Sequence, residues 1–114
     1  MSQQRTETRV SPSAPFWIYD RNGHKPIGRL EDFTTEGIRL SSDNLIQPGT
    51  ILPCKMAVPE EVNKSGAITF DAKSIWSKKH PDSNKYHTGF MLLNVIRGEI
   101  ERLKNLSASS VSNQ

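Results

Sequence analysis

The sequence predicts a mainly β protein, a six-stranded antiparallel β-barrel followed by one C-terminal α-helix. Between Pro15 and Leu93, short segments with apolar residues at every second position alternate with turn-forming residues, as in many small barrels. After Val95 the apolar spacing changes to that of a helix. The chain has 114 residues, which fits one domain with a core that needs neither disulfide nor metal.

Six segments are predicted as strands. Asn22–Gly23 predicts a hairpin between the first two, because both residues tolerate positive φ. Gly28, inside the second strand, indicates a bulge or a sharp bend. In the fifth strand, Trp76 is expected on the same face as Phe70 and Ala72, at period-two spacing. The predicted strands span residues 16–20, 25–33, 38–40, 51–58, 67–77 and 86–93.

The last part of the pattern predicts one amphipathic helix of about three turns. Ile96, Ile100, Leu103 and Leu106 fall at helical spacing, with charged residues between them. This helix should cover an open end or a face of the barrel. Because both ends of the chain are mostly polar, we expect a flexible segment over 1–14, the barrel with its helix over 15–106, and a disordered tail over 107–114.

The composition limits the classes of function. The net charge of +3 is a mild bias towards anionic partners, too small to indicate nucleic acid by itself. The single cysteine, Cys54, excludes an internal disulfide, and with no secretory signal or 20-residue apolar run it predicts a cytoplasmic protein without membrane insertion. The histidines and the cysteine lack metal-ligand spacing, and no catalytic motif appears. We therefore expect no enzymatic activity, metal or cofactor.

Two short motifs stand out. The first is Arg5 and Arg9, and the second, one hairpin later, is Asp32, Thr34 and Gly37. Guanidinium groups form forked, charge-assisted hydrogen bonds to phosphates and to the O6/N7 edge of guanine. A carboxylate can accept from N1 and N2 of guanine, a threonine adds a hydroxyl, and a glycine permits a tight turn. Each motif alone is weak, but the two in this order predict a site for a guanine nucleotide.

These motifs resemble those of the PilZ family, whose pattern is R-x-x-x-R followed by D/N-x-S-x-x-G, on a six-stranded barrel with a helix after it. The resemblance covers about residues 5–106, including Ile75-Trp76 and the segment 86–90. It implies binding of the bacterial second messenger cyclic di-GMP, with the arginines on phosphates and guanine edges and the second motif on a base. It also implies that Trp76 can stack on a guanine. Thr34 stands where the family usually has serine.

The expected function is therefore a stand-alone cyclic di-GMP receptor. With no other output domain in the sequence, the signal would pass to a downstream protein, through ordering of the N-terminal segment on binding. One alternative is a ligand-independent adaptor of the same family, such as one acting in type IV pilus assembly, although the retained motif residues argue against it. Arg29 and Arg39 could line the site, but solvation at the surface is the favoured interpretation for both.

The second alternative is a small basic barrel that binds single-stranded nucleic acid. Such a barrel needs several exposed aromatic side chains along a basic groove. The candidates do not cluster in an RNA-binding signature, so nucleic acid is an unlikely partner; they are Trp17, Tyr19, Trp76 and Tyr86.

Overall fold

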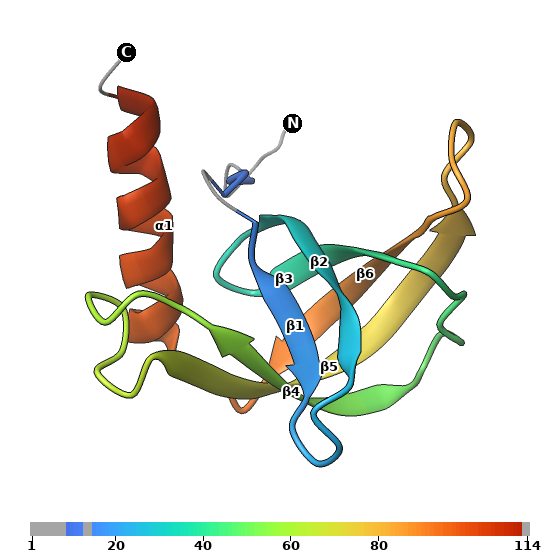
Figure 1. The fold of residues 1–114 in the computed structure, drawn as a ribbon, viewed down its shortest axis with the longest axis horizontal. Coiled ribbons are helices and arrows are strands. Elements are labelled where there is room, and N and C mark those ends of the chain that lie inside the picture. Colours follow the sequence, from blue (N-terminus) through green and yellow to red (C-terminus); the bar gives the residue numbers. More distant parts are fainter. Residues whose placement is uncertain (1–8, 13–14, 113–114) are drawn as a thin grey trace, which may run out of the picture.

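A computed structural model describes residues 9–12 and 15–112 of the chain. Six antiparallel strands close into a barrel in the order β1-β2-β3-β6-β5-β4, and one helix stands beside it (Figure 1). This architecture confirms the predicted fold class. The elements are β1 (Trp17–Asp20), β2 (Pro26–Phe33), β3 (Gly37–Ser42), β4 (Ile51–Ala57), β5 (Ala67–Lys79), β6 (Tyr86–Leu93) and α1 (Arg97–Ser112).

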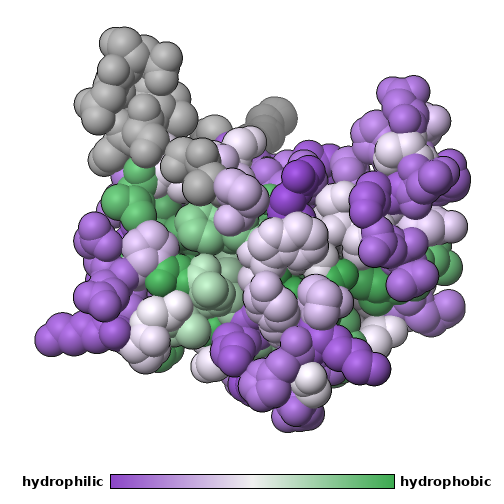
Figure 2. Space-filling view, in the orientation of Figure 1, coloured by the Kyte–Doolittle hydropathy of each residue, from purple (hydrophilic) through white to green (hydrophobic). Residues whose placement is uncertain are grey.

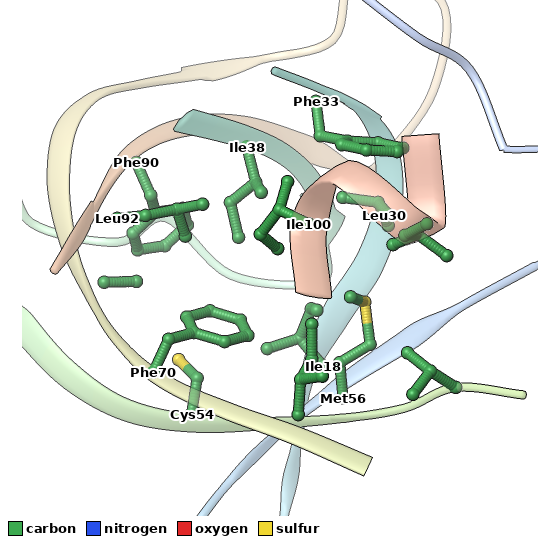
Figure 3. Close-up of a cluster of buried hydrophobic side chains, with 14 of the residues drawn as sticks. Ile18, Leu30, Phe33, Ile38, Cys54, Met56, Phe70, Phe90, Leu92 and Ile100 are labelled. Atoms are coloured by element: carbon green, nitrogen blue, oxygen red, sulfur yellow. The ribbon is translucent and has the colours of Figure 1, made fainter. Parts of the chain in front are cut away.

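The hydrophobic core fills the barrel interior. Figure 3 shows inward side chains from several strands surrounding Ile100, which enters from α1. Ile100 and Leu103 are each only 1% exposed, so the first half of the helix covers an open end of the barrel. Cys54 is buried on the inner face of β4, as its place in the apolar alternation indicates. The helix is longer than predicted, because it continues past Leu106 to Ser112.

Two β-bulges reverse the inward–outward alternation of side chains. On β2, Leu30 pairs with Leu40 and Asp32 with Arg39, so Glu31 is the extra residue. After this bulge Phe33 enters the core, while Asp32 shares the outer face with its cross-strand partner Arg39. Bulges of this kind commonly re-aim side chains near functional sites. The bulge in β2 therefore keeps a carboxylate out of the core.

The second bulge corrects the prediction for Trp76. On β5, Ser74 pairs with Phe90 and Trp76 with Gly89, so Ile75 is the extra residue. The phase of the strand changes there. Phe70, Ala72 and Ser74 point inward, but Trp76 points outward and is 37% exposed. Trp76 does not share a face with Phe70, as strict alternation had suggested.

The first hairpin forms as predicted, although by different backbone geometry. The positive φ lies at His24 (60°) and not at Asn22 or Gly23. The Asp20 carboxylate accepts the backbone N–H groups of Asn22 and Gly23 and so fixes the turn. Gly28 lies at an irregularity of the β1–β2 pairing, as expected. The hairpin joining β5 to β6 projects from the barrel, and hydrophilic side chains cover it (Figures 1 and 2).

Candidate ligand-binding site

A groove of about 850 Å³ lies on the outer wall of the barrel, and both sequence motifs contribute to it. It is bordered by the β2–β3 turn, the outer faces of β3, β5 and β6, and the start of α1. Pockets for drug-sized ligands usually have volumes of roughly 300–1,000 Å³. The groove lining combines charged, small and aromatic residues, among them Arg9, Asp32, Thr34, Gly37, Arg39, Trp76, Gly89 and Arg97.

Arg9 and Asp32, which are 23 positions apart in the sequence, are in direct contact. Arg9 Nε donates to Asp32 Oδ1 at 2.6 Å. A pair of backbone hydrogen bonds holds Arg9 in place, because Val10 N–H donates to the Phe33 carbonyl (2.9 Å) and Phe33 N–H to the Val10 carbonyl (3.0 Å). The structure thus brings together one residue from each motif. Arg5 lies outside the described residues.

Asp32 is also bound by a second arginine, which the sequence had indicated mainly as a solvated charge. Arg39 donates from its terminal Nη2 to Asp32 Oδ2 at 2.5 Å. With these two contacts, both oxygens of Asp32 are paired with guanidinium groups, and the side chain is only 12% exposed. One signal could have identified Arg39: it lies two residues after Gly37 in a strand, and therefore on the same face.

The Arg39 guanidinium has a feature that its ion pair does not explain. Its Nε is buried and has no hydrogen-bond partner among the described residues. A buried donor without a partner costs about 1–3 kcal/mol, and such groups in native structures often mark a functional site. Of the two interpretations of Arg39, the structure favours the one that was ranked second, because the guanidinium is half-enclosed at the groove.

The second motif forms a compact turn between β2 and β3. The Thr34 hydroxyl oxygen accepts the backbone N–H groups of Glu36 and Gly37, both at 3.2 Å. Thr34 lines the groove and can also act as a donor there, since a hydroxyl is both donor and acceptor. Gly37 has no positive φ. It is needed because a Cβ there would lie 2.9 Å from the Phe90 carbonyl oxygen on β6.

Trp76 covers Gly89 and forms an apolar part of the groove wall. A Cβ built on Gly89 would lie 2.6 Å from Trp76 Cε2 and closer still to Nε1, so the indole lies directly over this glycine. Gly89 pairs with Trp76 on one side and with Arg39 on the other. Trp76, Gly89 and Arg39 therefore form a row across three neighbouring strands, with an aromatic ring at one end and a guanidinium at the other.

The charges of the groove leave a small positive excess. Arg97, at the start of α1, lies 3.6 Å from Glu36 in an exposed pair, which contributes little to stability. Among the described residues that line the groove, three arginines face two carboxylates. Burial lowers the pKa of His87 on β6, and the positive charge of nearby Arg39 lowers it further. Within the part of the chain that the structure covers, no three metal-binding side chains cluster.

A closed barrel with a partly apolar, arginine-bearing groove on its outer wall defines a ligand-binding domain. The family model described as PilZ domain matches residues 3–109, nearly the whole chain. The chain therefore belongs to the PilZ family. No curated protein matches the chain in sequence.

Three solved structures of low sequence identity have the same fold. The chain is similar to the PilZ domain of Escherichia coli YcgR with c-di-GMP (TM-score 0.67, 16% identity, 97% of this chain and 96% of that one). It is also similar to the Bacillus subtilis inhibitor of motility MotI/DgrA (TM-score 0.74, 17% identity, 99% of this chain and 54% of that one). A third similar structure is the K. pneumoniae MrkH–c-di-GMP complex (TM-score 0.68, 14% identity, 98% of this chain and 54% of that one). The chain thus spans about half the length of the latter two. In the described part of the chain, no helix has the length and apolar character needed to cross a bilayer.

Proposed function

We propose that this chain is a cyclic di-GMP receptor and not an enzyme. The observation that carries the proposal is the contact between Arg9 and Asp32, which joins the two halves of the family motif at one groove. Two of the similar structures contain c-di-GMP, which supports the same ligand here. Arg9 and Arg5 bind its phosphates and guanine edges, since forked guanidinium donors suit both groups.

The remaining predicted site residues have complementary roles in this proposal. Asp32 accepts the N1 and N2 hydrogens of a guanine, and the Thr34 hydroxyl donates to the same base. Gly37 allows the turn to lie close against β6. The outward-facing Trp76 stacks on a guanine, an interaction worth about 1–3 kcal/mol per base.

Calorimetric titration of cyclic di-GMP tests the proposal. Wild-type protein is expected to bind, and Arg9→Ala is expected to bind at least about tenfold more weakly, because a charge-assisted hydrogen bond is lost. Arg29→Ala is the matched control. Arg29 also lies on the outer face and also forms an ion pair, with Glu31, but it is outside this groove. A wild type that neither binds nor shows a thermal shift would refute the proposal and favour a ligand-independent adaptor.

The signal is proposed to pass through the N-terminal segment to a downstream protein in the cytoplasm. Arg9 is attached to the end of β2 by the Val10–Phe33 bridge, so ligand contacts at Arg9 act directly on the chain that precedes it. Hydrogen exchange of residues 1–12, with and without ligand, tests this step. Slower exchange is expected with the ligand. Equal exchange in both states would contradict signalling by this route while leaving ligand binding intact.

A further inference from the structure

We propose that Arg39 is a ligand-binding arginine of this site, which donates to a phosphate of the nucleotide whose guanine Asp32 holds. This inference rests on the proposed function, and it adds a residue outside both sequence motifs. Arg39 lies on β3, two residues beyond Gly37, and lines the same groove as Arg9 and Asp32.

The first support is the charge balance of the groove. Arg9 and Asp32 form one ion pair, and Arg97 and Glu36 form another, so each pair is close to neutral overall. Arg39 also pairs with Asp32, so two arginines share one carboxylate and the described groove residues carry one excess positive charge. A dianionic ligand is attracted only by a site with excess positive charge, because a neutral ion pair gives little net field. Arg39 therefore contributes to this attraction together with Arg9, with which it shares the Asp32 carboxylate.

The second support is the donor capacity of the Arg39 side chain. A guanidinium carries five N–H donors in a fixed fork. Asp32 takes a hydrogen bond from Nη2, and the side chain is still 36% exposed, so terminal donors of the fork other than the buried Nε face the solvent. The bond to Asp32 fixes the orientation of the guanidinium. The other donors of the fork are thus preorganised for an acceptor with several oxygens, which a phosphate provides.

The third support is the position of Arg39 relative to Trp76. The two residues flank Gly89 across neighbouring strands. Adjacent strands lie about 4.8 Å apart, so the backbones of Arg39 and Trp76 are separated by about 10 Å. Both long side chains can therefore reach one nucleotide lying in the groove, with the base on the indole that covers Gly89 and a phosphate against the guanidinium.

Titrations of cyclic di-GMP into Arg39→Ala and Arg39→Gln test the inference, with Arg29→Ala as the control. Both Arg39 variants are expected to bind about tenfold more weakly or worse, while Arg29→Ala stays within about twofold of wild type. Thermal denaturation checks that each variant is folded. If wild type binds and the folded Arg39→Gln binds equally well, this inference fails and the proposed function stands. If wild type does not bind, the proposed function itself fails.

A double-mutant cycle separates ligand contact from an indirect effect through Asp32. Arg39→Gln is combined with Asp32→Asn, and the loss of affinity is compared in the two backgrounds. A direct contact predicts that Arg39→Gln still weakens binding severalfold when Asp32 is replaced. A loss confined to the wild-type background would make Arg39 a positioning residue and would overturn the inference. If the Asp32→Asn protein binds too weakly to measure, the hypoxanthine analogue of the ligand, which lacks the 2-amino group, replaces that substitution.

Discussion

The glycine beneath the Trp76 indole allows ligand stacking to be tested without removing the tryptophan. In Gly89→Ala, the new methyl group would lie 2.6 Å from Trp76 Cε2, so the indole must move off β6. The ring is at the end of a partly exposed side chain and can move without disturbing the backbone. We therefore expect Gly89→Ala to displace the ring while the barrel stays folded.

The size of each effect can be worked out from these contacts. Replacing glycine by alanine lowers the conformational entropy of the unfolded chain and so stabilises a protein by about 0.4–1 kcal/mol. This gain offsets part of the free energy that moving the indole costs. The net change in unfolding free energy is therefore within about 1 kcal/mol, or roughly 4–8 °C in Tm at most. Loss of base stacking costs about 1–3 kcal/mol, which lowers the affinity for cyclic di-GMP about 5- to 140-fold.

Calorimetric titration and thermal denaturation measure the two effects on the same samples. Trp76→Ala should lower the affinity by a similar factor. Gly23→Ala is the matched control, because no atom lies within 4 Å of a Cβ at that position and its φ is not positive. A folded Gly89→Ala protein that binds like wild type would refute the stacking role of Trp76.

Two further predictions concern groups outside the groove. Hydrogen bonds from Asn94 (2.7 Å) and Arg21 (3.0 Å) lower the pKa of Asp71 below its ordinary value of 3.8. The unfolded chain then binds this proton more readily than the folded one, so the stability from Asp71 is present above about pH 4 and is lost as the pH falls through the lowered pKa. Asp71→Asn should therefore flatten the dependence of Tm on pH below about pH 5. The control is the same change at an aspartate of the β5–β6 hairpin, Asp82→Asn, which should leave that dependence unchanged. Parallel curves of Tm against pH for wild type and Asp71→Asn would contradict the prediction. Burial raises the pKa of the Cys54 thiol to about 12, so a disulfide reagent at pH 8 should modify it only at the rate of unfolding, and rapid modification of the native protein would show that the thiol is accessible.

Much of the fold follows from local patterns in the sequence. Period-two alternation identifies β4 and β6, and the change to helical spacing identifies the start of α1. The end of α1 was harder to predict, because the mostly polar residues after Leu106 are compatible both with a last helical turn and with a disordered tail. Ser107 is nevertheless 2% exposed, which shows that packing continues beyond Leu106, the last residue of the predicted apolar face. Tertiary contact, and not intrinsic propensity, determines the length of such a helix.

The candidate site was predictable only in part. The sequence identified Arg9, Asp32 and Trp76, but it placed Trp76 on the wrong face and treated Arg39 as a solvated charge. Both errors concern pairing between strands that are distant in sequence. Which residue lies beside Gly89 on its two neighbouring strands depends on register, and no local pattern encodes that register.

The bulge at Glu31 could have been recognised from the sequence, whereas the bulge at Ile75 could not. Leu30 and Phe33 are both large and apolar but three residues apart, so a regular strand would expose one of them. Only an inserted residue lets both reach the core, as the structure shows. Beyond Ile75 no such conflict exists, because Trp76 continues the apolar phase set by Phe70 and Ala72.

The two bulges together explain why this wall of the barrel has a binding groove. Without the first, the Asp32 carboxylate would point into the core, where an ionised group is costly without partners. Without the second, Trp76 would point inward, where small hydroxyl side chains now meet through the Ser77–Thr88 contact of 2.8 Å. Each bulge thus turns outward a side chain that the proposed ligand needs. The same bulge keeps that side chain out of the barrel core. The same irregularities that complete the interior also shape the groove of the proposed site.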